Sequence, residues 1–260
     1  MVAARVWIGV LSCTVVLTGC GVIPQFQDRA KEIATDPVKY SNEHMKVDEF
    51  SRSVREKLPQ AGTEPLGFKT LKVSGSVRSE AADGTATSSD LESTYINDQN
   101  DGLVRGISHQ TRNGLPYLFS LDLTYRGLVP FMRQSGLSAT LRRPSLDRAR
   151  EINAWPGGVR DVPEHGSFTF EWESTLYFGS ALQMHRKFTC VSGENYPAFR
   201  FMPHIPGDAI DVLCTSFNEN GVEVSKEKAV FLRAYGMAVT VERTSASAKF
   251  TVRYKTLTVE

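Results

Sequence analysis

The chain has 260 residues, of which 30 are Lys or Arg and 29 are Asp or Glu, so its formal net charge is +1. A nearly neutral chain has no general electrostatic attraction to nucleic acid or to anionic lipid, which argues against a nucleic-acid-binding protein. The hydrophobic content of 41% and the aromatic content of 10% exclude a largely disordered chain.

The first twenty residues have the layout of an export signal. Arg5 precedes a short apolar run, Val6–Leu17, and the run ends in Leu17-Thr18-Gly19-Cys20. A helix that spans a bilayer needs about 20 apolar residues, and this run is both shorter and diluted by small and polar side chains. The pattern therefore favours a cleaved signal over a transmembrane anchor.

This segment resembles the signal peptide of bacterial lipoproteins, and the resemblance covers only the first twenty residues. It implies a signal peptide over residues 1–19, cleavage between Gly19 and Cys20, and a lipid on Cys20 that attaches the protein to a membrane of the cell envelope. Gly21 is not an acidic retention signal. In a Gram-negative host the resemblance thus implies the outer membrane, facing the periplasm.

Residues 20–60 form a short helical tether in this interpretation. Pro37 ends any first helix, and a better helix is predicted over 43–58, where Val47, Phe50, Val54 and Leu58 recur at helical spacing. Such a helix either binds a partner or membrane, or packs its apolar stripe on the domain that follows. The narrow stripe and the mixed charges of the polar face favour packing.

From Leu66 onward the hydrophobic period changes to two, which is typical of half-buried antiparallel strands. Ser145–Ile152 is the one later segment predicted as a helix, with Ser145 as its cap. The fold prediction is a mainly β protein with an antiparallel β-sandwich-like domain over 61–260. Uneven strands and a Pro- and Gly-rich joint near 155–166 favour two packed sheets over a closed barrel, and leave open one domain or two.

The hairpin around Asn113-Gly114 allows a sharper prediction. Ile107 is expected opposite Leu121, and Leu103 opposite Tyr125, because this register keeps apolar side chains on one face. It calls for a connection of three or five residues with Gly114 at positive φ.

The cysteines divide by position. Cys13 leaves with the signal and Cys20 takes the lipid, so Cys190 and Cys214 remain as one pair. Each lies with apolar neighbours on one face of a predicted strand, and a lone pair in an exported protein predicts a disulfide. The alternative is two buried free thiols.

No strong catalytic or cofactor motif follows Cys20. Asn97–Gly102 lacks the twelfth-position Glu of a calcium loop, and Ser225–Lys228 lacks the companion elements of Ser-x-x-Lys enzymes. Both are interpreted as turns, and the polar residues 161–165 as a solvated loop. No catalytic residue, metal site or cofactor is predicted.

The preferred function is a non-enzymatic envelope lipoprotein that binds a protein partner or has an assembly or structural role. The alternative is a carrier or sensor of a hydrophobic ligand, and a hydrolase is third. A filled core would favour the first, and a dry apolar cavity the second. In the second case, an inward row would line the cavity: Phe168, Phe170, Trp172 and Phe178.

Overall fold

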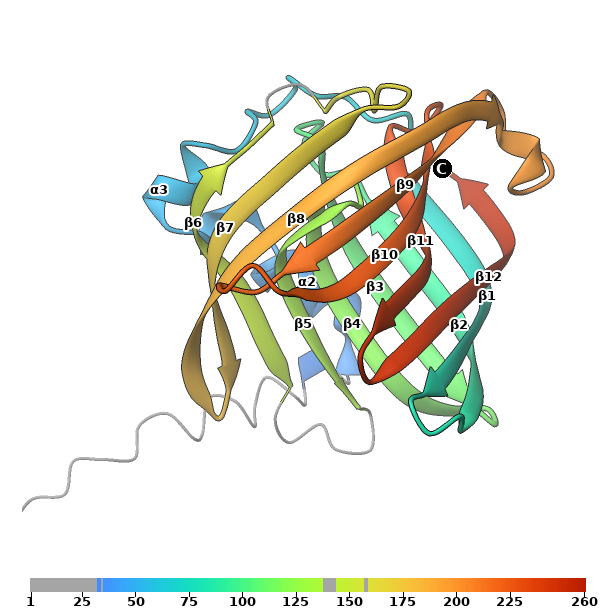
Figure 1. The fold of residues 1–260 in the computed structure, drawn as a ribbon, viewed down its shortest axis with the longest axis horizontal. Helices are drawn as coiled ribbons and strands as arrows, with labels where there is room; N and C mark the ends of the chain where they lie inside the picture. The colour runs from blue at the N-terminus through green and yellow to red at the C-terminus, as the bar shows by residue number, and fades with distance from the viewer. Residues whose placement is uncertain (1–31, 34, 138–143, 157–158) are drawn as a thin grey trace, which may run out of the picture.

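A computed structural model describes residues 32–33, 35–137, 144–156 and 159–260. The lipoprotein-like signal and Cys20 lie outside these residues. Twelve antiparallel strands form a closed barrel in which each strand pairs with its neighbours in sequence and β1 pairs with β12 (Figure 1). The strands are β1 Thr70–Ala81, β2 Ala86–Ile96, β3 Leu103–Arg112, β4 Leu115–Tyr125, β5 Val129–Leu137, β6 Ser145–Ala154, β7 Ser167–Phe178, β8 Ser180–Pro197, β9 Asp208–Phe217, β10 Glu223–Leu232, β11 Met237–Ser245 and β12 Ala248–Val259.

The mainly β prediction is confirmed, but the sandwich is wrong. Strands β1 and β12 pair from Leu71–Val259 to Ala81–Ala248, and this pairing closes the sheet on itself. Closure removes the two free edges that an open sheet would carry. The segment 155–166 joins β6 to β7, which are neighbours in the same barrel, so the strands before and after it share one fold.

Ser145–Ile152 is a strand, not the predicted helix. It forms most of β6, and its side chains alternate between the two faces of the wall. Asp147 pairs with Arg186 of β8, whereas Arg148 donates to the backbone oxygen of Glu49 in the N-terminal segment. The backbones of β5 and β7 supply hydrogen-bond partners that a local charge pattern cannot reveal.

The β3–β4 hairpin has the predicted register and a different turn. Leu103 lies opposite Tyr125 and Ile107 opposite Leu121, which confirms the pairing. The connection has only two residues, because Arg112 pairs with Leu115, and both Asn113 and Gly114 have positive φ. The register is nevertheless as predicted, because a bulge beside Gln110 inserts one extra residue. From the sequence, this extra residue was expected in a longer loop.

The N-terminal segment packs against the barrel wall instead of forming a free tether. It contains α2 (Pro37–His44), the 3-10 helix η1 (Val47–Glu49) and α3 (Arg52–Arg55). The helix predicted over 43–58 is therefore broken. Residues 32, 33 and 35 are helical and this helix stops before Pro37, as predicted, while Pro37 also begins α2, since a proline fits the first turn. Asp36 caps α2 by accepting from the Lys39 N–H at 2.9 Å.

This segment nevertheless buries its apolar side chains, as the packing alternative predicts. Val54 of α3 is fully buried, and α3 contacts β6. The Tyr40 hydroxyl of α2 donates to the Gln134 side chain of β5 at 2.9 Å. In Figure 1, α2 lies behind β3, β4 and β5, so the segment covers one side of the barrel from outside. No helix among the described residues has the length and apolarity to span a membrane.

Cys190 and Cys214 lie directly opposite each other in β8 and β9 and form a disulfide, as predicted. Both are buried. The chain between the two strands contains the short helix η3 (Ala198–Arg200).

Candidate functional site

The wall of the barrel under the N-terminal segment has its apolar face outward and its polar face inward. In β4, Phe119, Leu121 and Leu123 are buried in one cluster with side chains of the N-terminal segment. The intervening Asp122 and Thr124 line a cavity inside the barrel. The alternation of β4 therefore predicts a half-buried strand correctly, while the polar row faces the lumen and not bulk solvent.

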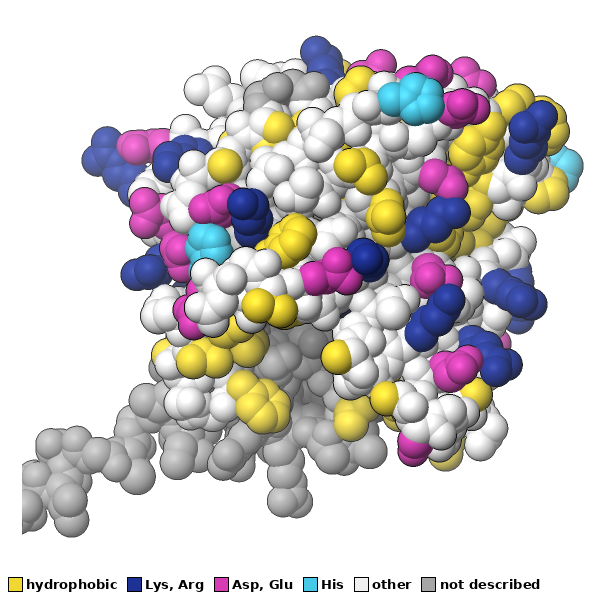
Figure 2. All heavy atoms as spheres, in the orientation of Figure 1, with side chains coloured by type: hydrophobic (Ala, Val, Ile, Leu, Met, Phe, Trp, Pro, Cys, Tyr) yellow, Lys and Arg dark blue, Asp and Glu magenta, His cyan; other side chains and the backbone are white. Residues whose placement is uncertain are grey.

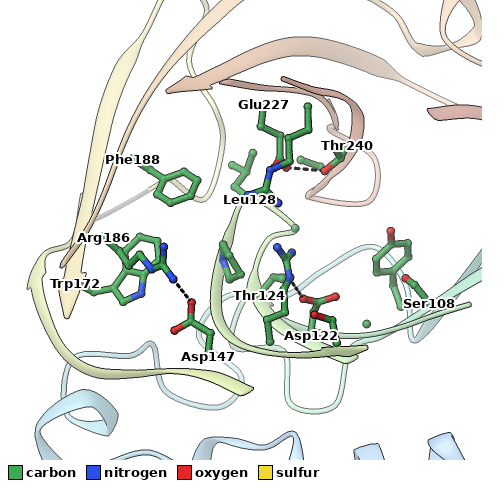
Figure 3. Close-up of a pocket in the computed structure, with 18 of the residues that line it drawn as sticks. Ser108, Asp122, Thr124, Leu128, Asp147, Trp172, Arg186, Phe188, Glu227 and Thr240 are labelled. Carbon is green, nitrogen blue, oxygen red and sulfur yellow. Dashed lines mark hydrogen bonds and ion pairs between the residues drawn. The ribbon is translucent and has the colours of Figure 1, made fainter. Parts of the chain in front are cut away.

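The cavity has a volume of about 330 Å³ and runs along the lumen (Figure 3). One wall is apolar. Trp172 of β7 and Phe188 of β8 stack with ring centroids 5.2 Å apart, and Leu176 and Leu128 extend this wall. Aromatic faces of this kind accept flat or aliphatic groups of a ligand.

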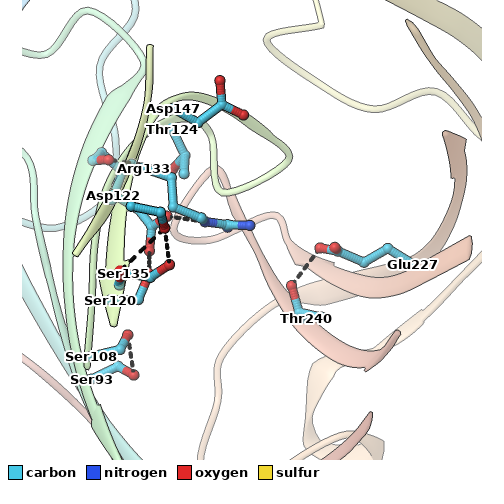
Figure 4. Close-up of polar contacts among 12 residues, drawn as sticks. Ser93, Ser108, Ser120, Asp122, Thr124, Arg133, Ser135, Asp147, Glu227 and Thr240 are labelled. Carbon is cyan, nitrogen blue, oxygen red and sulfur yellow. Dashed lines mark hydrogen bonds and ion pairs between the residues drawn. The ribbon is translucent and has the colours of Figure 1, made fainter. Parts of the chain in front are cut away.

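The other wall is polar and carries paired charges. The Arg133 Nε donates to Asp122, whose second oxygen accepts from Ser120 at 2.8 Å (Figure 4). The Arg186 guanidinium donates to Asp147 at 2.6 Å. Charge-assisted pairs between such groups hold both side chains in place.

A third pair of opposite charges is not joined directly. Glu227 of β10 and Arg243 of β11 are opposite each other in register and both line the cavity. Glu227 accepts from the Thr240 hydroxyl at 2.7 Å. Within the described part of the chain, the Arg243 guanidinium has no hydrogen bond and no ion pair within 4.0 Å.

The lumen perturbs the protonation of its side chains. Burial, followed by the nearby Asp122 carboxylate, raises the pKa of Tyr95 to about 12, so its hydroxyl stays protonated at neutral pH. Desolvation lowers the pKa of Arg243, the Glu227 carboxylate opposes this shift, and the positive charges of Arg133 and Arg186 act in the same direction as desolvation. An arginine remains charged at neutral pH despite such a shift, so three guanidinium groups face one lumen.

Aromatic side chains pack together at the end of the barrel where β6 connects to β7. Trp155 packs on Tyr125 at a centroid distance of 4.5 Å, on Phe131 at 5.4 Å and on Phe170 at 5.6 Å. We call this the loop end, and the opposite end, where β3 turns into β4 and β7 into β8, the hairpin end (Figure 1).

Only one residue of the predicted inward row lines the cavity. Trp172 does, whereas Phe168 and Phe170 are buried in the core. Phe178 is 71% exposed, because it ends β7 at the tight turn around Gly179 and extends past the barrel. The assignment of Phe178 to a ligand-binding row is therefore wrong.

Charged residues of the calcium-like segment, of Ser225–Lys228 and of the polar residues 161–165 form ion pairs with residues outside these motifs. Asp98 binds the Arg105 side chain with both carboxylate oxygens, at 2.8 and 3.0 Å, so the calcium-like segment is a turn. Ser225 and Lys228 lie in β10 on opposite faces, and Lys228 pairs with Asp211 at 2.7 Å outside the lumen. Asp161 pairs with Arg233. Among the described residues, no group of three or more His, Cys, Asp or Glu side chains is placed to hold a metal ion.

The polar lumen residues were missed by sequence reasoning, although a signal existed. Most of them are single charged residues in the polar row of an alternating strand. Residues of opposite charge lie on strands that are close neighbours in the barrel. They are Asp122, Arg133, Asp147, Arg186, Glu227 and Arg243. The face of the barrel seen in Figure 2 is different, since charges of both signs are interspersed there with single apolar side chains.

No family model and no curated protein matches this chain. Three solved structures resemble this chain loosely in shape. A DUF1329 family protein from Desulfovibrio piger is 7% identical, with a TM-score of 0.39 over 74% of this chain and 86% of that one. An outer membrane lipoprotein-sorting protein domain from Vibrio parahaemolyticus is 8% identical, with a TM-score of 0.39 over 76% and 88%. A β-barrel-like protein of the DUF1849 domain from Brucella abortus is 6% identical, with a TM-score of 0.38 over 75% and 99%. These values describe a loose resemblance of shape and do not extend to function.

Proposed function

We propose that this protein is a non-enzymatic envelope protein whose barrel lumen binds a small amphiphilic molecule. The observation that carries the proposal is the cavity of about 330 Å³ between an aromatic wall and a charged wall. This volume is at the lower end of the range for small-molecule sites. A purely hydrophobic ligand would leave the Arg243 guanidinium, which has no partner among the described residues, without one, so the ligand class is narrower than the sequence suggested.

The binding test uses decanoate as the probe and two variants of one hairpin. Phe188→Ala removes a ring that lines the cavity, and Phe178→Ala removes an exposed ring of the same type at the turn. We expect Phe188→Ala to weaken decanoate binding roughly tenfold, which corresponds to about 1.4 kcal/mol, and Phe178→Ala to leave it unchanged. Calorimetric titration measures both. The proposal fails if the unmodified protein binds no decanoate, or if the two variants behave alike.

A second candidate function is the docking of a protein partner at the hairpin end. Large apolar side chains are exposed on three turns there: Leu115 beside the β3–β4 turn, Phe178 and Leu182 beside the β7–β8 turn, and Val222 and Val224 beside the β9–β10 turn. Exposed apolar groups gathered on one end of a protein favour an interaction surface. Replacing Leu115, Phe178 and Val222 by Ser should abolish a specific cross-link formed in intact cells. An unchanged cross-link would place the partner elsewhere.

Attachment to the envelope membrane through a lipid on Cys20 is part of the proposed function. The lipoprotein-like segment Leu17-Thr18-Gly19-Cys20 supports it. Cys20→Ala should release the protein from membranes that retain the unmodified chain after a high-salt wash, because stable anchoring needs acyl chains. If the variant still sediments fully with membranes, the lipid is not the anchor.

A further inference from the structure

We propose that Arg243 binds the anionic head group of the lumen ligand, a carboxylate or a phosphate. This inference rests on the proposed function, and it assigns the ligand a charge and an orientation. The position of Arg243 is fixed by its strand, since it lies opposite Glu227 on one side and opposite Phe250 on the other, with its side chain at the cavity.

The first argument is the difference between Arg243 and the two other lumen arginines. Arg133 and Arg186 each donate to a carboxylate, Asp122 and Asp147 respectively. Among the described residues nothing accepts from the Arg243 guanidinium, which carries five N–H donors in a planar fork. A carboxylate or phosphate is the group that matches this fork with two parallel hydrogen bonds.

The second argument is that Glu227 does not neutralise Arg243 by contact. The Glu227 carboxylate is held by the Thr240 hydroxyl at 2.7 Å, and no ion pair within 4.0 Å joins it to Arg243. In Figure 4, the Arg133 guanidinium reaches from Asp122 toward Glu227, so a second arginine faces this carboxylate across the lumen. The donors of Arg243, an exposed side chain that lines the cavity, therefore remain open to a ligand.

The third argument is the distance between the charged and the apolar subsites. Arg243 is on β11, and the rings of Phe188 and Trp172 are on β8 and β7, three and four strands away along the wall. Strands are spaced by roughly 4.8 Å, so the separation along the wall to Phe188 is about 14 Å. A ligand with its anion at Arg243 would reach the aromatic wall with an aliphatic tail.

The test compares three probes that share one tail: decanoate, decyl phosphate and decanol. Arg243→Gln should weaken binding of both anions roughly 10- to 100-fold and leave decanol binding unchanged. Arg243→Lys should retain part of the anion affinity, because it keeps the charge and loses the fork. Arg253→Gln is the matched control, since Arg253 is an exposed arginine like Arg243 but lies on the adjacent strand β12 and does not line the cavity.

The outcomes separate the two proposals. If the unmodified protein binds decanol as tightly as the anions, or Arg243→Gln binds decanoate and decyl phosphate normally, the head-group assignment is wrong while lumen binding stands. If no probe binds, the proposed function itself fails. A loss of all three probes in Arg243→Gln, with an unchanged melting temperature, would also contradict a head-group role. The anion that loses more affinity in Arg243→Gln identifies the natural head group as carboxylate or phosphate.

Discussion

The Glu64 carboxylate joins the N-terminal segment to the loop end of the barrel. It accepts from the Tyr125 hydroxyl at 2.7 Å and from the Arg126 guanidinium at 3.1 Å, and Arg126 is only 1% exposed. Burial and the adjacent Glu64 raise the pKa of Tyr125, so its hydroxyl remains a donor. Glu64 is therefore the ion-pair partner that compensates the buried charge of Arg126.

We predict that Glu64→Ala lowers the free energy of unfolding by about 3–5 kcal/mol, because it leaves the Arg126 charge buried without its partner. Urea denaturation measures the change. The control is Glu260→Ala, which breaks a half-exposed pair with Lys72 and should cost less than about 1 kcal/mol. Equal effects of the two variants would mean that the buried pair adds nothing beyond an ordinary surface pair.

Gly127 is a second position where a single residue is required. Its φ is +70°, and a Cβ atom there would lie 2.1 Å from the Ala238 carbonyl oxygen. Gly127→Ala should destabilise the fold by about 3 kcal/mol or more, from backbone strain and overlap together. Gly62→Ala has a similar φ of +78° with open space around it and should cost about 1–2 kcal/mol. Denaturation curves that coincide for the two variants would show that the backbone moves to relieve the overlap.

At the scale of elements, the disulfide links two strands that are already paired. Cys190 and Cys214 close a covalent loop across a sequence separation of 24 residues. Replacing both by Ala should lower the free energy of unfolding by about 3 kcal/mol, mainly because the unfolded chain regains freedom. The barrel should persist, since the β8–β9 hydrogen bonds remain. Mass spectrometry after denaturation and alkylation without reductant checks that the Cys190–Cys214 bond exists. Free alkylation of both thiols would disprove the bond.

At the scale of the whole molecule, the N-terminal segment is part of the core. Six of its apolar side chains are buried: Ile33, Tyr40, Met45, Phe50, Val54 and Leu58. They cover the outward apolar row of β4, which would otherwise face water. We therefore expect the barrel to need this cover for its stability.

A chain that begins at residue 66 should consequently aggregate or melt far below the full chain, because it exposes this apolar face. A chain that begins at residue 32 keeps the cover and is the control. Thermal melting and size-exclusion chromatography of the two forms check the prediction. Equal stability of the two would mean that the segment is a tether after all.

The sequence by itself determined the features that depend on alternation along one strand. The period of two predicts the β content, the opposition of Ile107 and Leu121, and the common face of Cys190 and Cys214 with their apolar neighbours. Each of these follows from which residues share a face, and that is a local property of an extended chain. The polar row of β4 was likewise visible, yet its role as part of a binding cavity was not.

Only the tertiary structure decided which face of each strand is inside. Alternation does not distinguish a lumen from solvent, and the N-terminal cover turns the apolar row of β4 outward. Closure depends on the pairing of β1 with β12, which lie at opposite ends of the domain sequence. The segment Ser145–Ala154 forms the strand β6 because it pairs with β5 on one side and with β7 on the other. The six charged side chains of the lumen converge from six strands, β4 to β6, β8, β10 and β11, and no local pattern encodes that convergence.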